Sequence, residues 1–161
     1  MTRVPSYDSV ADLLKILISF HSQLADMYGR LNAMVDDKYA KLLAEEMQRR
    51  ELRLVETLSG YEKNAPERIL DTMLQKSYPE NPNDLLSEME AQMKPETTAR
   101  LSPDDIYSLG SRADSHIEEL LSVLHDSSNV PEVRDVFKDL HDGEELERIA
   151  LSKAYNSLRE M

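Results

Sequence analysis

Five ionisable residues interrupt otherwise apolar helical faces in this chain, and their types could either hold a metal ion or form buried ion pairs. His21 interrupts the first face, Arg50 the second, Asp114 the third, and Glu144 with Glu147 the fourth. Each lies near the middle of its segment, so these residues would meet at one depth if the segments pack side by side. An unpaired buried charge is costly, so we expect them to be paired, bound to metal or hydrated.

The apolar residues around these positions recur at alternating spacings of three and four, which predicts amphipathic helices. The predicted helices cover residues 6–34, 36–63, 103–127 and 131–160 approximately, with Ser6 or Asp8 as the first cap. Ser102, followed by Pro103 and two aspartates, is a typical start for the third. We therefore predict one all-α domain over residues 1–161, an antiparallel four-helix bundle.

The segment 64–102 between the second and third helices is too long and too rich in proline for a hairpin loop. Prolines stand at positions 66, 79, 82 and 95. This spacing predicts a crossover connection with short helical pieces at Pro66–Lys76 and Asn83–Met93.

The two predicted helix pairs resemble each other internally. The second helix carries an apolar residue, two site positions and another apolar residue at offsets of four, three and four: Leu43, Met47, Arg50, Leu54. The fourth helix repeats these offsets with Leu140, Glu144, Glu147, Leu151. The first pair therefore looks like a diverged copy of the second.

Two such hairpins joined by a crossover resemble the ferritin-like superfamily, and most closely its rubrerythrin-like branch. The resemblance covers the four helices and not the crossover. It implies a site for two iron or manganese ions, built from a Glu on the first and third helices and a Glu-x-x-His on the second and fourth.

The metal-binding pattern of the family is altered here at most positions. The resemblance places the ligand positions at His21, at Met47 with Arg50, at Asp114, and at Glu144 with Glu147. Only Glu144 keeps the residue type of the family. A thioether is a poor ligand for hard cations, and a guanidinium is a fixed cation, so the second helix contributes no ligand.

Three interpretations of this polar set remain. In the first, Arg50 replaces the metals by donating to Asp114 and to Glu144 or Glu147, so the protein has no cofactor and acts as a binding or structural protein. In the second, His21, Asp114, Glu144 and Glu147 hold iron or manganese in a divergent oxidoreductase. In the third, some of these residues face solvent. Whether the chain is an enzyme stays open.

Composition excludes several other classes of function. The net charge of −12 argues against a general nucleic-acid binder and against docking on an anionic membrane. The chain has no cysteine, so disulfides and thiolate zinc sites are excluded. No phosphate-binding glycine loop or serine-hydrolase motif is present.

The expected location and partners follow from the same features. The sequence contains no signal-peptide pattern and no apolar run long enough to span a membrane, so we expect a cytoplasmic protein. Ferritin-like proteins commonly form oligomers, and the crossover carries many apolar residues. The resemblance therefore implies a homodimer or larger homo-oligomer. If the protein binds a further partner, we expect a small ligand or another protein.

Overall fold

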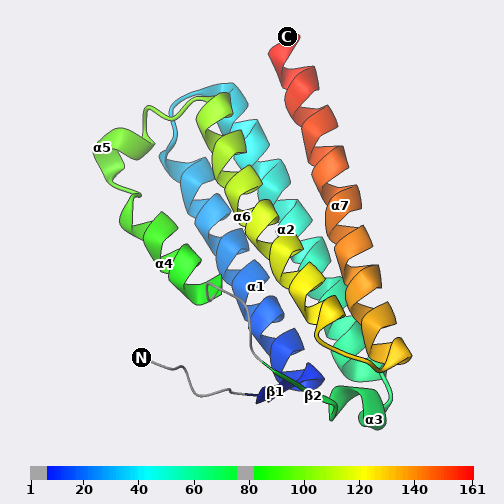
Figure 1. Ribbon diagram of the computed structural model, residues 1–161. Helices are drawn as coiled ribbons and strands as arrows, with labels where there is room; N and C mark the ends of the chain where they lie inside the picture. The colour runs from blue at the N-terminus through cyan, green and yellow to red at the C-terminus, as the bar shows by residue number, and fades with distance from the viewer. Residues whose placement is uncertain (1–6, 76–81) are drawn as a thin grey trace.

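The computed structural model describes residues 7–75 and 82–161, which are all-α apart from one small sheet. Four long helices lie side by side (Figure 1): α1 (Val10–Met34), α2 (Lys38–Asn64), α6 (Pro103–Asp126) and α7 (Pro131–Arg159). Helices α1 and α2 run in opposite directions, and so do α6 and α7. The predicted all-α class is confirmed.

Side chains satisfy the free amides at the starts of three of these helices. The Ser9 hydroxyl accepts a hydrogen bond from the Asp12 amide at the start of α1, and Asp37 accepts two amides of α2. Ser102 and Asp105 form a reciprocal capping box at the start of α6, where Ser102 was predicted to cap. These caps stabilise the starts of α1, α2 and α6.

Helix α1 begins later than predicted. Asp8 belongs to strand β1 (Tyr7–Ser9), which pairs antiparallel with β2 (Met73–Gln75), and Ser6 lies outside the described residues. The Val10 amide also donates to the Thr72 carbonyl, so pairing with the crossover keeps the chain extended up to Ser9. The other bounds of the long helices agree with prediction within two residues, the usual uncertainty of helix ends.

The crossover contains more secondary-structure elements than the two predicted helical pieces. Helix α3 covers only Glu67–Leu70 before β2 begins, whereas α4 (Pro82–Ala91) lies close to the predicted second piece. A further turn, α5 (Pro95–Thr98), was not predicted. Lys76, the predicted end of the first piece, lies outside the described residues.

The crossover covers the outer side of α1, where α4 packs against it (Figure 1). Most of its apolar side chains are consequently buried in the core, and Met73 is exposed. The buried ones are Ile69, Leu74, Leu85, Leu86 and Met89. These residues complete the core, which reduces the apolar surface that the crossover offers to a second subunit.

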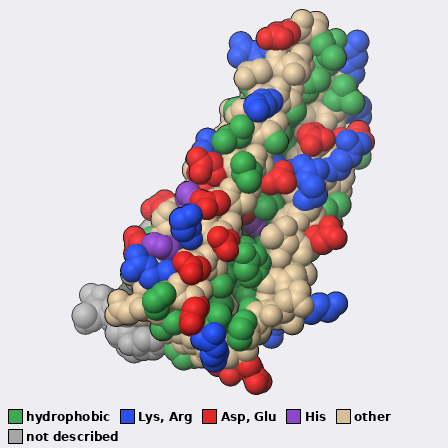
Figure 2. Space-filling model, turned by 90° about the vertical axis from the view of Figure 1, so that its right-hand side faces the viewer, with side chains coloured by type: hydrophobic (Ala, Val, Ile, Leu, Met, Phe, Trp, Pro, Cys, Tyr) green, Lys and Arg blue, Asp and Glu red, His purple; other side chains and the backbone are tan. Residues whose placement is uncertain are grey.

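The outer face of α7 is mixed in character. Figure 2, which views the molecule from that side, shows hydrophobic side chains gathered among acidic and basic ones. Within the ranges that the structure describes, no helix has both the length and the apolar character needed to cross a membrane.

Candidate functional site

Arg50 lies at the centre of the four long helices and is almost fully buried. Its Nη1 donates to Asp114 Oδ2 at 2.8 Å, and its Nη2 donates to Asp114 Oδ1 at 2.7 Å. The same Nη2 donates to Glu51 Oε1 at 3.0 Å. The contact with Asp114 is a bidentate pair that joins α2 to α6 and occupies both oxygens of that carboxylate.

His21 lies beside this pair and bridges two further carboxylates. Its Nδ1 is paired with Glu51 Oε2, and its Nε2 lies 2.8 Å from Glu144 Oε1. The second contact is close enough for an ion pair, although its geometry falls short of a hydrogen bond. Both oxygens of Glu51 are therefore engaged, one by each cation.

These contacts form one chain of alternating charge that runs Glu144, His21, Glu51, Arg50, Asp114. It connects α7, α1, α2 and α6, so every long helix contributes a member. Each side chain is at most 5% exposed. We call this set the charge network.

Neighbouring charges control the protonation of the network. Burial alone would lower the pKa of His21, but Glu144 and Glu51 outweigh it and raise that pKa from 6.5 to about 10. Burial would raise the pKa of Glu51, yet His21 and Arg50 hold it below its ordinary value. His21 is therefore a cation at neutral pH, and Glu51 is an anion.

Asp114 and Arg50 respond differently to their shared burial. Loss of hydration raises the pKa of Asp114 to about 6, because it exceeds the attraction of Arg50. For Arg50, burial acts to lower the pKa, but Asp114 and Glu51 raise it further above its already high value. The pair is thus ionic at pH 7, and acidification would protonate its carboxylate.

Three buried polar atoms in or beside the network have no hydrogen-bond partner among the described residues. They are His21 Nε2, the Tyr28 hydroxyl and Arg50 Nε. Burial and the nearby Glu51 raise the pKa of Tyr28, so its hydroxyl stays protonated. An unsatisfied buried donor is costly, and a buried water commonly satisfies such groups in proteins.

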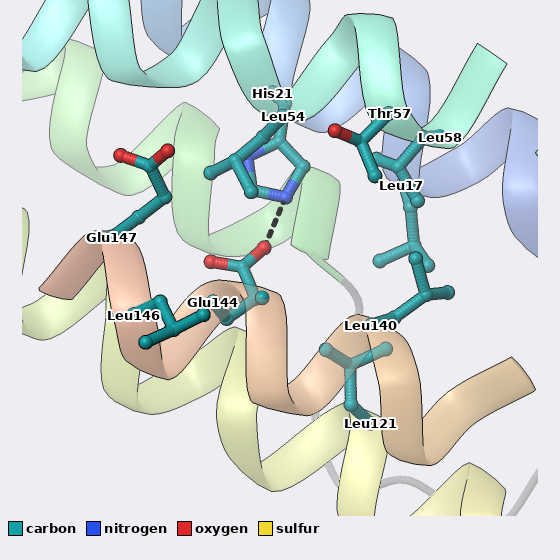
Figure 3. Close-up of a pocket in the computed structure, with 11 residues that line it drawn as sticks. Leu17, His21, Leu54, Thr57, Leu58, Leu121, Leu140, Glu144, Leu146 and Glu147 are labelled. Atoms are coloured by element: carbon teal, nitrogen blue, oxygen red, sulfur yellow. Dashed lines mark ion pairs between the residues drawn. The ribbon is translucent and has the colours of Figure 1, made fainter. Parts of the chain in front are cut away.

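A cavity of about 170 Å³ borders the network at its His21–Glu144 end. Figure 3 shows His21 and Glu144 in contact in the wall of this cavity, with leucine side chains beside them. The leucines are contributed by all four long helices: Leu17, Leu54, Leu58, Leu121, Leu140 and Leu146. The cavity is therefore largely apolar, and its polar lining consists of the His21–Glu144 pair, Thr57 and Glu147.

The structure brings together four of the six residues singled out from the sequence. His21, Arg50, Asp114 and Glu144 belong to the network. Met47 is buried but makes an apolar contact instead, since a methyl group added at Gly110 would lie 2.5 Å from its Cε. Because Gly110 has no side chain, Met47 has room to pack between α2 and α6.

Glu147 does not belong to the network, and its predicted role beside Arg50 was wrong. It is partly exposed and pairs with Arg53, whose Nη2 lies 2.9 Å from Glu147 Oε2. At the edge of α7 the carboxylate keeps part of its hydration and finds a cation on the neighbouring helix. The second carboxylate partner of Arg50 is Glu51 rather than Glu144 or Glu147.

Glu51 is the network member that sequence reasoning missed, although the sequence contained a signal for it. Positions 44, 47, 51, 54 and 58 alternate in steps of three and four, and all five side chains are buried. The buried stripe of a helix is wide enough to include both 50 and 51. Because Arg50 alone was assigned to the buried face, Glu51 was left out of the predicted site.

Metal-ligand geometry occurs elsewhere and at the surface. In the described part of the chain, the only group of three donor side chains close enough to hold an ion is His141, Asp142 and Glu145 on α7. All three are at least partly exposed, and they are neighbours on one helical turn, an arrangement common without any ion.

Comparisons with protein-family models, with curated proteins and with solved structures find no match to this chain. We therefore infer the function from the geometry of the charge network and its cavity.

Proposed function

We propose that this chain is a ferritin-like four-helix bundle in which two cationic side chains replace metal ions, and that it acts as a binding protein. Arg50 and His21 are the replacements. The observation that carries the proposal is the bidentate pair between Arg50 and Asp114, because it places a permanent cation among the central carboxylates.

The charges of the network support this interpretation. Buried carboxylates require compensation, which di-metal proteins obtain from bound cations. Here Glu51 is compensated by both Arg50 and His21, and Asp114 is compensated by Arg50. Since a guanidinium keeps its proton under all ordinary conditions, the compensation by Arg50 is always present.

The residues present do not fit the alternative of an iron or manganese oxidoreductase. Its ligands would be His21, Asp114, Glu144 and Glu147. Both oxygens of Asp114 accept hydrogen bonds from Arg50, and Glu147 pairs with Arg53 at the surface. A metal ion at Asp114 would also lie next to a guanidinium, which repels it.

A binding role is favoured by the cavity beside the network. Small-molecule sites are typically apolar hollows with a few polar groups that fix orientation, and this cavity has that character. Self-association through the crossover is a separate proposal. Sedimentation at two protein concentrations tests it, and a monomer at both would contradict it.

Metal analysis tests the proposed function. The protein would be expressed without a chelating tag in medium supplemented with iron and manganese, and its metal content would be measured after gel filtration. We expect clearly substoichiometric metal and the same melting temperature with and without EDTA. Near-stoichiometric metal whose removal lowers the melting temperature would overturn the proposal.

A matched pair of variants guards against binding at the surface. The trio His141, Asp142 and Glu145 could take up metal weakly, so the analysis would be repeated with His141→Ala. Metal lost with this substitution belongs to the surface of α7 and leaves the proposal intact. Metal retained by His141→Ala and lost with Asp114→Asn would lie in the core and contradict it.

A further inference from the structure

The wall of the cavity contains a carboxylate with an available oxygen. In the described part of the chain, Glu144 forms one ion pair, between its Oε1 and His21 Nε2. Figure 3 shows the other oxygen turned away from the imidazole. The carboxylate is buried, so water compensates it poorly.

The network as a whole lacks one positive charge. Two cations, Arg50 and His21, face three carboxylates, those of Glu51, Asp114 and Glu144. Loss of the His21 proton would increase the excess of negative charge. A ligand that enters the cavity next to Glu144 is therefore favoured if it carries a positive charge.

The remaining walls define the other part of the ligand. Six leucines line most of a volume of about 170 Å³, and Thr57 and the second carboxylate, Glu147, complete its polar wall. An apolar cavity of about 150 Å³ accommodates benzene, so a chain of about four to six carbons is a suitable size. A metal ion would leave this apolar volume unfilled, and a carboxylate would meet Glu144.

From these observations we infer that the cavity binds a short-chain primary alkylammonium ion. Its ammonium group donates to Glu144, and its alkyl chain packs among Leu54, Leu58 and Leu140. The inference rests on the proposed function, because it requires a core whose carboxylates are free of metal. It adds a class of ligand to that function.

Isothermal titration calorimetry with three ligands of equal chain length tests the inference. The probes are n-pentylammonium chloride, pentan-1-ol and sodium pentanoate, in about 0.15 M salt to screen the acidic surface. We expect pentylammonium to bind at least about tenfold more tightly than pentan-1-ol, because its hydrogen bond to Glu144 is charge-assisted. Pentanoate should not bind measurably.

Two substitutions on α7 separate the cavity from the surface. Glu144→Gln should remove the preference for pentylammonium over pentan-1-ol. Glu145→Gln makes the same change in net charge on the exposed side of the helix and should leave the preference unchanged. A third variant, Leu58→Phe, fills the cavity and should abolish binding of both ligands while the circular dichroism spectrum shows an intact helical fold.

The outcomes distinguish the inference from the function on which it rests. Equal binding of pentan-1-ol, tighter binding of pentanoate, no binding at all, or an equal loss with Glu145→Gln would each overturn the alkylammonium site. None of these results would indicate a metal ion in the core, so the proposed function would still stand. Stoichiometric core metal in the same preparation would instead overturn the proposed function.

Discussion

The two ends of the charge network differ in how completely they are enclosed. At the Arg50–Asp114 end, two hydrogen bonds of 2.7 and 2.8 Å join a guanidinium to a carboxylate, and both oxygens are occupied. At the His21–Glu144 end, a single contact of 2.8 Å joins an imidazole to a carboxylate that lines a cavity. Glu51 connects the two ends.

This difference separates a structural role from a binding role within one set of side chains. At the closed end, Arg50 and Asp114 do not line the cavity, and their charges compensate each other in the middle of the core. The open end has an apolar cavity and an incompletely compensated carboxylate. Substitution of Arg50 or Asp114 should therefore affect mainly folding, and substitution of Glu144 should affect mainly binding.

Removal of Arg50 should have the largest effect on stability. Arg50→Ala leaves Asp114 buried without a cation and leaves Glu51 with His21 as its only cation. We therefore expect the free energy of unfolding to fall by about 3–5 kcal/mol. Urea denaturation followed by circular dichroism measures this change. Arg53→Ala, which removes an arginine three residues away at the surface, should cost less than about 1 kcal/mol. Equal losses would contradict a special role for the buried arginine.

Titration of His21 should be the next largest effect. Because its pKa is raised from 6.5 to about 10 in the folded state, its contribution to stability is complete below pH 6.5. That contribution is lost as the pH rises towards and through 10. We expect stability to decline over this range in the wild type and to decline less in a His21→Gln variant. Parallel pH profiles for the two proteins would show that His21 is not the group responsible.

The two glutamates that flank His21 should differ in importance. Glu51 contacts both cations, whereas Glu144 contacts one and borders the cavity. We expect Glu51→Gln to destabilise the protein by about 2 kcal/mol more than Glu144→Gln, since it leaves two buried cations with less compensation. Urea denaturation of the two variants gives the difference. A larger loss for Glu144→Gln would reverse the assignment of the closed and open ends.

The smallest effect is expected outside the network. Glu147 is partly exposed and its partner Arg53 is about half exposed, so Glu147→Gln should change the free energy of unfolding by less than about 1 kcal/mol. Thermal melts of this variant beside Glu144→Gln give the comparison. A cost as large as that of Glu144→Gln would place Glu147 in the core after all.

The sequence predicted the long helices well because their signals are local. Spacing of apolar residues, the caps and the prolines each depend on neighbours along the chain, and they located the helices to within a few residues. The start of α1 was missed because a pairing between distant segments, β1 and β2, decides it. The division of the crossover into α3, α4 and α5 likewise depends on how it packs against α1.

The site was harder to predict because a repeat of spacing does not fix which side of a helix faces inwards. Glu147 occupies the position in α7 that corresponds to Arg50 in α2, yet one side chain is at the surface and the other is buried. The outcome depends on the neighbour available to each. Glu147 meets Arg53 at the helix edge, and Arg50 meets Asp114 in the interior.

A crystal structure with anomalous diffraction data collected at the iron and manganese absorption edges can show whether Arg50 or a metal ion compensates the central carboxylates. The protein would be crystallised after expression in medium containing both metals. We expect a guanidinium in bidentate contact with Asp114 and no anomalous peak among Glu51, Asp114 and Glu144. An anomalous peak bridging these carboxylates, with the Arg50 side chain turned to solvent, would contradict it.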